Sequence, residues 1–422
     1  MYLKGSNWNM QRRRKRSSPW RVFFLALAVA GVIYINQVIV PETPPLFVDT
    51  PTPTRAPDSY LIEAQQLIAA GKVNQAILTY EEAVKADPRN PSIYVTLARW
   101  QVLYGEYDKA LENATNALLL NENHALAKAV KGWALEKLGR FEEAKFELDE
   151  ALELDRNSAL AYAYRAEMYI DMLSAGKGDI TTQENAIEDS RRARDLASDL
   201  LEVRRVRGLV LEYTNQSEEA IKEFEAAIAL NETLAELHVA LGRNYRYTQQ
   251  SDKAVNSLMK AISLAPNDSA PYAELAATYL NLGEFVLGAQ IAEQAVERDP
   301  TAPFLRGLLG TMFYRQEKYN EALPHLRLAV RGGLDDDGVQ VEPMALDAYN
   351  LSSIMYRLRY GIALSNIGQC GEALTVAQEL VTKIPDDPNV SANVPVIYEL
   401  CHEQAENSAS EEPEVTETPA QE

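Results

Sequence analysis

Small residues recur along this chain at a fixed spacing of 34 positions. One series comprises Ala76, Ala110 and Ala144, a second comprises Ala186, Ala220, Ala254, Gly288 and Ala322, and Ala373 follows after one more break. A constant period of this length, with a small residue at a constant phase, predicts a stack of helical hairpins. Each small side chain would let two helices approach closely.

The first unit shows how the period is built. It spans about Asp58 to Asn90, and Gly71 divides it into two halves with apolar residues at helical spacing. Each half is too short to bury its apolar face alone, so neighbouring units must stack. Pro88 ends the second half because proline cannot continue a helix. We therefore expect two helices per unit, joined by a glycine turn.

Later units repeat this layout. Their recurring residues include Tyr94, Leu97, Gly105, Tyr107 and Ala117, then Gly132, Leu135, Gly139, Phe141 and Ala151, and later Leu241, Gly242, Tyr245, Leu258 and Ala261. The pattern resembles the tetratricopeptide repeat, in nine copies over about residues 57–390. The resemblance implies an all-α fold, a right-handed superhelical solenoid of about nine helix-turn-helix repeats. It also implies that the first helices line a concave groove in which proteins or peptides bind.

Two intervals depart from the period. The interval between Ala144 and Ala186 is 42 positions, which predicts a longer loop near 174–184. The interval between Ala322 and Ala373 is 51 positions, which predicts an insertion near 331–350. A solenoid needs a cap over its last exposed core face, and we expect Pro395–Gln404 to form that capping helix.

The N-terminal segment is basic and then apolar. Residues 1–41 contain seven Lys or Arg and no acid, and Trp20 to Val40 is a 21-residue stretch. That length is close to the ~20 residues of a membrane-spanning helix. We expect a single-pass signal anchor with the N-terminus cytoplasmic and the repeats extracytoplasmic, because basic flanks stay inside. A signal peptide cleaved near Ala28–Ala30 and a cytoplasm-facing repeat domain are the alternatives.

These features predict five segments. They are a basic cytoplasmic segment (1–19), a transmembrane helix (20–40), a Pro/Thr-rich linker (41–57), the solenoid (58–404) and an acidic disordered tail (405–422). The linker holds six prolines. Such a composition favours extended conformations, so the linker is either a semi-rigid stalk or a disordered connection.

The charge excludes one class of partner. The formal net charge is −20, and because the first 41 residues contribute +7, the remainder carries −27. Nucleic-acid binders show a basic face, so no nucleic-acid partner is expected. From Ile384 to the end there are ten acids and no Lys or Arg, a composition typical of a disordered tail.

No catalytic or metal-binding constellation is found. The histidines (His124, His238, His325 and His402) lie in different units without metal-ligand spacing. Gly176–Asp179 lacks the upstream glycine and the Ser or Thr of a phosphate loop, and Asp335–Gly338 lacks alternating calcium ligands. No Ser/His/Asp or Cys/His set can be assembled. We therefore expect no enzyme activity, no cofactor and no metal.

The two cysteines, Cys370 and Cys401, fall where neighbouring helices of a hairpin stack meet. In an oxidising compartment they could form a disulfide across the cap. Two buried thiols are the alternative.

The repeat phase predicts groove-facing residues. They are Arg99, Trp133, Arg205, Tyr213, Arg243, Arg246, Tyr247, Tyr314 and Arg315. Arginine and aromatic side chains are the usual anchors of protein interfaces, so this set suggests capture of an acidic peptide or a free carboxylate. The alternative is that the arginines pair with Glu202, Glu212 and Glu236. The Lys/Asn carboxylate clamp of the family's chaperone-binding members is not present.

The function that these features favour is a non-catalytic, membrane-tethered scaffold that binds partner proteins in the groove, in a cell-envelope assembly or secretion process. The alternatives are an accessory subunit of a glycosyl-transfer or polysaccharide-export system, and a cytoplasm-facing import or chaperone receptor. Neither the partner nor the oligomeric state follows from the sequence.

Overall fold

The computed structural model describes residues 18–35, 37, 55–348 and 350–410, and the chain divides into two compact units, 1–56 and 57–422. Most of the predicted basic segment and linker, and the tail from 411, lie outside the described residues.

The described part of the first unit is one apolar helix, α1 (Pro19–Tyr34), of 16 residues and without a buried residue. At 1.5 Å per residue it is about 24 Å long, short of the ~30 Å of a bilayer core. Among the described helices, none combines the length and the apolar character needed to cross a membrane. The transmembrane helix predicted at 20–40 is therefore not supported, and residues 36 and 38–40 of that prediction lie outside the described residues.

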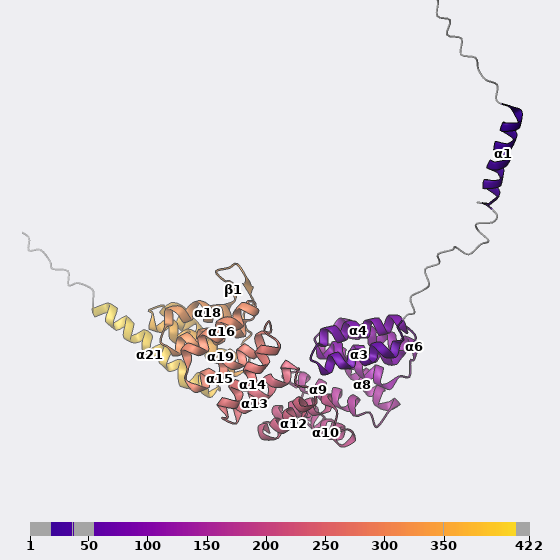
Figure 1. Ribbon diagram of the computed structural model, residues 1–422. Coiled ribbons are helices and arrows are strands. Elements are labelled where there is room, and N and C mark those ends of the chain that lie inside the picture. Colours follow the sequence, from indigo (N-terminus) through magenta and orange to yellow (C-terminus); the bar gives the residue numbers. More distant parts are fainter. Residues whose placement is uncertain (1–17, 36, 38–54, 349, 411–422) are drawn as a thin grey trace, which may run out of the picture. The chain divides into compact units, whose positions relative to one another are not determined.

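The described residues of the second unit form nine helix pairs and a final helix, as the 34-residue period predicts, together with one short strand pair. Figure 1 labels several of these helices. The pairs are α3 (Pro57–Ala69) and α4 (Val73–Ala86), α5 (Pro91–Leu103) and α6 (Tyr107–Leu120), α7 (Ala125–Lys137) and α8 (Phe141–Leu154), α9 (Ala159–Ser174) and α10 (Ile180–Leu196), α11 (Leu201–Tyr213) and α12 (Ser217–Leu230), α13 (Ala235–Tyr247) and α14 (Ser251–Leu264), α15 (Ser269–Leu282) and α16 (Phe285–Arg298), α17 (Pro303–Arg315) and α18 (Tyr319–Arg331), and α19 (Leu351–Asn366) and α20 (Cys370–Lys383). The last helix is α21 (Pro388–Ser410).

The small residues of the period lie where the helices meet, in the second helix of each pair. Ala76, Ala110, Ala144, Ala186, Ala220, Ala254, Ala322 and Ala373 are all 0 % exposed. Gly288 is also buried, and a Cβ added there would lie 2.8 Å from Met312 Sδ. The packing role predicted for these positions is confirmed.

The turn inside most pairs needs a left-handed residue. Gly105 and Gly139 have φ of 79° and 74°, which glycine adopts without steric cost. Three pairs place another residue at this position: Asn215, Gln249 and Glu317, with φ of 58°, 60° and 60°. An L-residue there costs roughly 1–2 kcal/mol, so these turns are strained.

The extra residues of the two long intervals in the repeat period form different structures. Near 174–184, a loop was predicted, but most of the extra residues extend helices: α9 and α10 have 16 and 17 residues, where α5 and α6 have 13 and 14. Near 331–350, the insertion contains a short antiparallel hairpin of β1 (Gly333–Leu334) and β2 (Gln340–Val341). Arg306 pairs with Asp335 and holds this hairpin to α17. The described fold is therefore all-α except for one two-stranded ribbon.

The cap is longer than predicted. Helix α21 covers the end of the stack with Val390, Val394 and Ile397, which are at most 3 % exposed. The Cys370–Cys401 disulfide joins the first residue of α20 to α21, with the two Cα atoms 5.5 Å apart. It closes the terminal repeat onto its cap.

A groove along the first helices

The first helices of successive pairs contact one another from α5 to α19, so they form one side of the stack. Two clefts follow this side. One, of about 490 Å³, is lined by α13, α15, α17 and α19, and the other, of about 640 Å³, is lined by α9, α11 and α13. Tyr247 lines both clefts, so they adjoin at the end of α13. We call them the C-terminal cleft and the middle cleft.

The middle cleft contains three of the predicted residues, Tyr213, Arg243 and Tyr247. Tyr213 and Tyr247 are 37 % and 53 % exposed, so both rings are available to a partner. Arg243 is not free. It is paired with Glu212 through two nitrogen atoms, and its Nη1 lies 3.4 Å from Glu274 Oε1.

Arg246 lines the C-terminal cleft and is neutralised in the same way. Its Nη2 donates to Glu274 Oε2 at 2.7 Å, and its guanidinium lies over the Tyr247 ring at 4.8 Å. Burial disfavours the charge of Arg243, but the hydrogen bonds and charge of Glu212 raise the pKa of Arg243 overall. The alternative raised for these arginines, pairing with Glu202, Glu212 and Glu236, therefore describes Arg243, whereas Arg246 pairs with Glu274, which that alternative did not name.

The remaining wall of the C-terminal cleft comes from α17 and α19. Phe304 and Leu351 are 40 % and 58 % exposed, while Tyr356 is buried and Arg359 is half-buried. The Tyr356 ring packs on the bare backbone of Gly307, where an added Cβ would lie 2.3 Å from it. Tyr314 and Arg315 stand beside this wall, near enough for Arg315 to influence the pKa of Arg359.

The three predicted residues of the early repeats lie elsewhere. Trp133 is 1 % exposed and stacks on Tyr164 with ring centroids 4.2 Å apart. Arg205 is 5 % exposed and pairs with the buried Glu167. Arg99 pairs with Glu202. Trp133 and Arg205 are thus buried by the protein's own side chains and present no open surface to a partner.

Contacts between repeats that are distant in sequence explain why Trp133 and Arg205 are buried. Arg99 on α5 reaches Glu202 on α11, 103 positions away. The turn at Gly71 also packs against Thr233, whose methyl group would lie 2.8 Å from an added Cβ. The early repeats therefore contact the start of α11 and the turn before α13, and their inward-facing side chains become interior ones. The 34-residue pattern contains no signal for these contacts.

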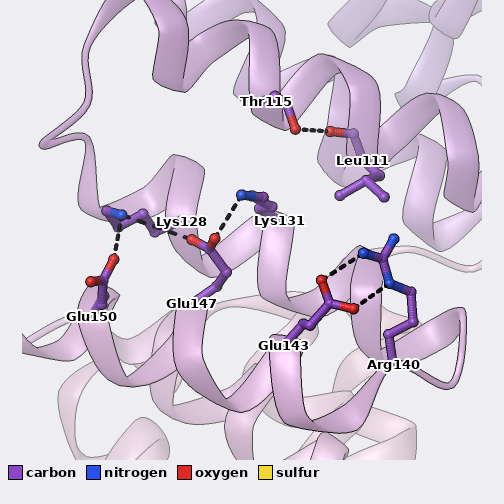
Figure 2. Close-up of polar contacts among 8 residues, drawn as sticks. All are labelled: Leu111, Thr115, Lys128, Lys131, Arg140, Glu143, Glu147 and Glu150. Atoms are coloured by element: carbon purple, nitrogen blue, oxygen red, sulfur yellow. Dashed lines mark hydrogen bonds and ion pairs between the residues drawn. The ribbon is translucent and has the colours of Figure 1, made fainter.

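A third cleft, of about 440 Å³, lies between α6, α7 and α8 and has paired charges (Figure 2). Lys131 Nζ donates to Glu147 Oε1 at 2.6 Å, and Arg140 donates to both carboxylate oxygens of Glu143 at 2.7 and 2.6 Å. The same view includes Lys128 with Glu150, and Thr115 with the Leu111 carbonyl. Since Lys131 and Arg140, the two cations that line this cleft, are each paired with a glutamate, the cleft offers no unpaired positive charge to a ligand.

Sequence reasoning found only Arg246 and Tyr247 of the C-terminal cleft and missed the rest of its lining, including Glu274, Phe304, Tyr356 and Arg359. Phe304 follows the first-helix phase and could have been found from it. Tyr356 and Arg359 lie on α19, within the irregular 51-position interval, where the phase is uncertain. Within residues 18–35, 37, 55–348 and 350–410, no three His, Cys, Asp or Glu side chains gather as a metal site would require.

The comparisons with known proteins agree with the helix pairs. The sequence model of the tetratricopeptide repeat matches residues 67–112, 126–158, 206–234 and 235–268. Each matched range lies within the stack.

Two curated relatives are similar over a short stretch. Tetratricopeptide repeat protein 28 of Homo sapiens is 31 % identical over 134 residues, and that of Mus musculus is 30 % identical over 132. Each match covers 28 % of this chain and 5 % of the relative, so the chain spans a small fraction of these relatives.

Among solved structures, a monomeric mutant of IFIT1 with Gppp-AAAA aligns with a TM-score of 0.53 and 16 % identity. The alignment covers 86 % of this chain and 85 % of that one. A tetratricopeptide repeat protein from Parabacteroides merdae aligns over 61 % of this chain and 98 % of that chain, with 15 % identity and a TM-score of 0.39. At such identities the IFIT1 likeness shows the fold alone.

Proposed function

We propose that this chain, which contains tetratricopeptide repeats, is a non-catalytic interaction scaffold that binds an extended peptide segment along α9 to α19. The observation that carries the proposal is the pair of adjoining clefts that share Tyr247. They are lined by exposed aromatic residues, Tyr213, Tyr247 and Phe304, beside arginine side chains. Aromatic and arginine side chains supply most of the binding energy in protein interfaces.

The arginine–glutamate pairs indicate which residues of the two clefts would bind the peptide and which would support them. Arg243 and Arg246 already satisfy Glu212 and Glu274, so a ligand would gain little charge attraction from them. The exposed rings gain more, because covering an aromatic side chain removes apolar surface from water. In this proposal Tyr213, Tyr247 and Phe304 are the anchors, and the arginine–glutamate pairs orient and stiffen the wall behind them.

Site-specific photo-crosslinking in the native host tests the proposal. A photoreactive residue is introduced at Tyr247 and at Phe304, with Leu119 on α6, 80 % exposed and outside both clefts, as the control. We expect discrete adducts from both cleft positions and none from Leu119. The same adducts from Leu119, or none from either cleft position, would contradict binding in the groove.

A membrane tether and an extracytoplasmic repeat domain are also part of the proposal. Two observations support them: α1 exposes apolar side chains all round, and the repeats carry the Cys370–Cys401 disulfide. An apolar helix with no buried face favours a non-aqueous environment, and disulfides persist in oxidising compartments.

Alkaline carbonate extraction tests the tether, and protease treatment of spheroplasts tests the topology. The proposal expects the chain in the membrane pellet and the repeats accessible from outside. Release into the supernatant would contradict the tether. Protection of the repeats would favour the cytoplasm-facing alternative.

A further inference from the structure

One end of the C-terminal cleft carries positive charge without a carboxylate. Arg359 Nη1 donates to Thr311 Oγ1 at 3.0 Å, and the Thr311 hydroxyl in turn donates to the Gly307 carbonyl at 2.8 Å. The charged and titratable groups that influence Arg359 are Tyr356, Tyr314 and Arg315, none of which is an acid. Among the described residues, then, Arg359 makes only this neutral hydrogen bond.

A second cation, Arg315, increases the electrostatic cost of keeping Arg359 charged. Its guanidinium lies over the Phe285 ring at 4.9 Å, and within the described part of the chain it has no ion pair. Burial lowers the pKa of Arg359, the hydroxyl groups of Tyr356 and Tyr314 oppose that shift, and the charge of Arg315 adds to it. Two like charges that lie near each other repel, and an anion bound beside them would relieve that repulsion.

The two ends of the C-terminal cleft differ in charge. At the α13–α15 end, Arg246 is held by Glu274 at 2.7 Å, so that end is close to neutral. At the α17–α19 end, Arg359 lines the cleft, is half-buried and has no carboxylate partner among the described residues. A ligand in the cleft therefore meets a guanidinium without a carboxylate at that end only.

Beside these cations lies an apolar shelf. It is formed by Phe304 and Tyr356, whose ring centroids are 6.2 Å apart, and by Leu351, which is 58 % exposed. The absence of a side chain at Gly307 leaves room for the Tyr356 ring to pack against α17. A ligand that suits this end has a negative group next to an apolar one.

We propose that the α17–α19 end of the cleft binds a carboxylate of an acidic peptide, with Arg359 and Arg315 as its cationic partners and the neighbouring apolar side chain on the Phe304–Tyr356 shelf. The planar guanidinium fork matches a carboxylate in shape and charge. A peptide supplies both the carboxylate and the apolar neighbour at the spacing of adjacent residues. This site rests on the proposed function, since it specifies which peptide segment the groove prefers.

An array of immobilised heptapeptides tests the site on the full-length chain in detergent. The central residue is Glu, Gln, phosphoserine or Lys, and its neighbour is Leu or Gly. We expect Glu–Leu peptides to bind at least tenfold more strongly than Gln–Leu peptides at low salt, which corresponds to about 1.4 kcal/mol. The preference should weaken at high salt, because charge interactions at a partly open site are screened.

Variants assign the preference to these residues. In Arg359→Gln and Arg315→Gln the Glu-over-Gln ratio should fall to about one, while Arg359→Lys should keep part of it because the charge remains without the fork. Arg140→Gln removes an arginine that pairs with Glu143 outside the cleft, and it should leave the ratio unchanged. Arg359→Gln should not lower the melting temperature, because it removes an unopposed charge.

The outcomes separate the two proposals. If Glu and Gln peptides bind equally, or if Arg359→Gln keeps the full preference, the carboxylate site is wrong while groove binding stands. If phosphoserine peptides exceed Glu peptides tenfold, the site takes a different anion and the proposal is also overturned. If no peptide binds and Tyr247 gives no adducts, both proposals fall together.

Discussion

Buried charges in this chain are stabilised by partners that lie far along the sequence. Glu167 is 1 % exposed, pairs with Arg205 and lies 2.6 Å from Lys137 Nζ. Burial raises the pKa of Glu167, but Arg205 and Lys137 outweigh that effect and lower it to about 2. Because the interior cannot solvate a lone carboxylate, the cost of losing one partner should exceed the worth of the pair.

Arg205→Met tests that asymmetry. It leaves Glu167 with one cation instead of two, so we expect it to lower the free energy of unfolding of this region by about 2–4 kcal/mol. The double variant Arg205→Met/Glu167→Leu should recover a large part of the loss, since no charge then stays uncompensated. Denaturant unfolding of the two variants measures this, and a double variant no more stable than the single one would contradict it.

His325 makes the stability of the fold depend on pH. It lies on α18, stacks on Phe313 with ring centroids 5.8 Å apart, and its Nδ1 is buried without a hydrogen bond. Burial, and then the charge of Arg306, lower the pKa of His325 to about 4, while Asp336 acts in the opposite direction. Between pH 6.5 and about 4, the imidazole of His325 is therefore protonated in the unfolded chain and neutral in the folded chain.

This histidine should therefore destabilise the fold as pH falls through that window. Stability rises with pH wherever the unfolded state binds more protons, so the loss begins below about 6.5 and is complete near 4. The window corresponds to at most about 3 kcal/mol. His325→Phe should flatten the pH dependence of unfolding between these limits, with His402→Phe in the cap as the control. Parallel curves for the wild type and His325→Phe would exclude the effect.

At the scale of the element, the turn within each pair is the unit that the sequence encodes most locally. Gly105 and Gly139 occupy the left-handed position at little cost, whereas Gln249 adopts a φ of 60° there. The backbone N–H of Gln249 donates to the Arg246 carbonyl at 3.1 Å, so this left-handed residue helps to end helix α13. The strain is stored in the turn between α13 and α14.

Gln249→Gly should stabilise that pair. Removing the steric cost of a side chain at positive φ gains about 1–2 kcal/mol, and the greater freedom of glycine in the unfolded chain returns part of it, for a net gain of about 0.5–1 kcal/mol. Asn215→Gly is the matched control at the same turn position and should gain less, because asparagine tolerates this region. Hydrogen exchange of the α13 and α14 amides provides the measurement, and unchanged or faster exchange would contradict the prediction.

At the scale of the whole repeat unit, stability is distributed along the stack. Each repeat contacts chiefly its neighbours, so a local loss need not unfold distant repeats. The C-terminal end is tied by the Cys370–Cys401 bond, which closes a loop with a sequence separation of 31. A cross-link of that span contributes about 3–4 kcal/mol by restricting the unfolded chain.

Removing this disulfide should therefore loosen the cap alone. In Cys370→Ala/Cys401→Ala, or after reduction, amides of α21 and α20 should exchange faster, while those of α5 to α8 keep their rates. Hydrogen exchange followed by mass spectrometry resolves the two regions. Uniform acceleration along the whole stack would show instead that the repeats unfold as one unit.

The helix pairs, their number and the buried phase of residues such as Ala110 and Ala254 could be predicted from the sequence, because they depend on contacts within a repeat and with the next one. The sequence also indicated part of the candidate groove, with Tyr213 and Tyr247 in the two clefts. It did not indicate that Trp133 and Arg205 are enclosed, or that Arg359 lies unopposed. Those outcomes depend on the curvature summed over many repeats and on pairings such as Arg99 with Glu202, 103 positions apart. Which inward-facing charges find a partner depends on how the repeats fold together, because a periodic pattern specifies the direction of a side chain and not its distance from a distant repeat.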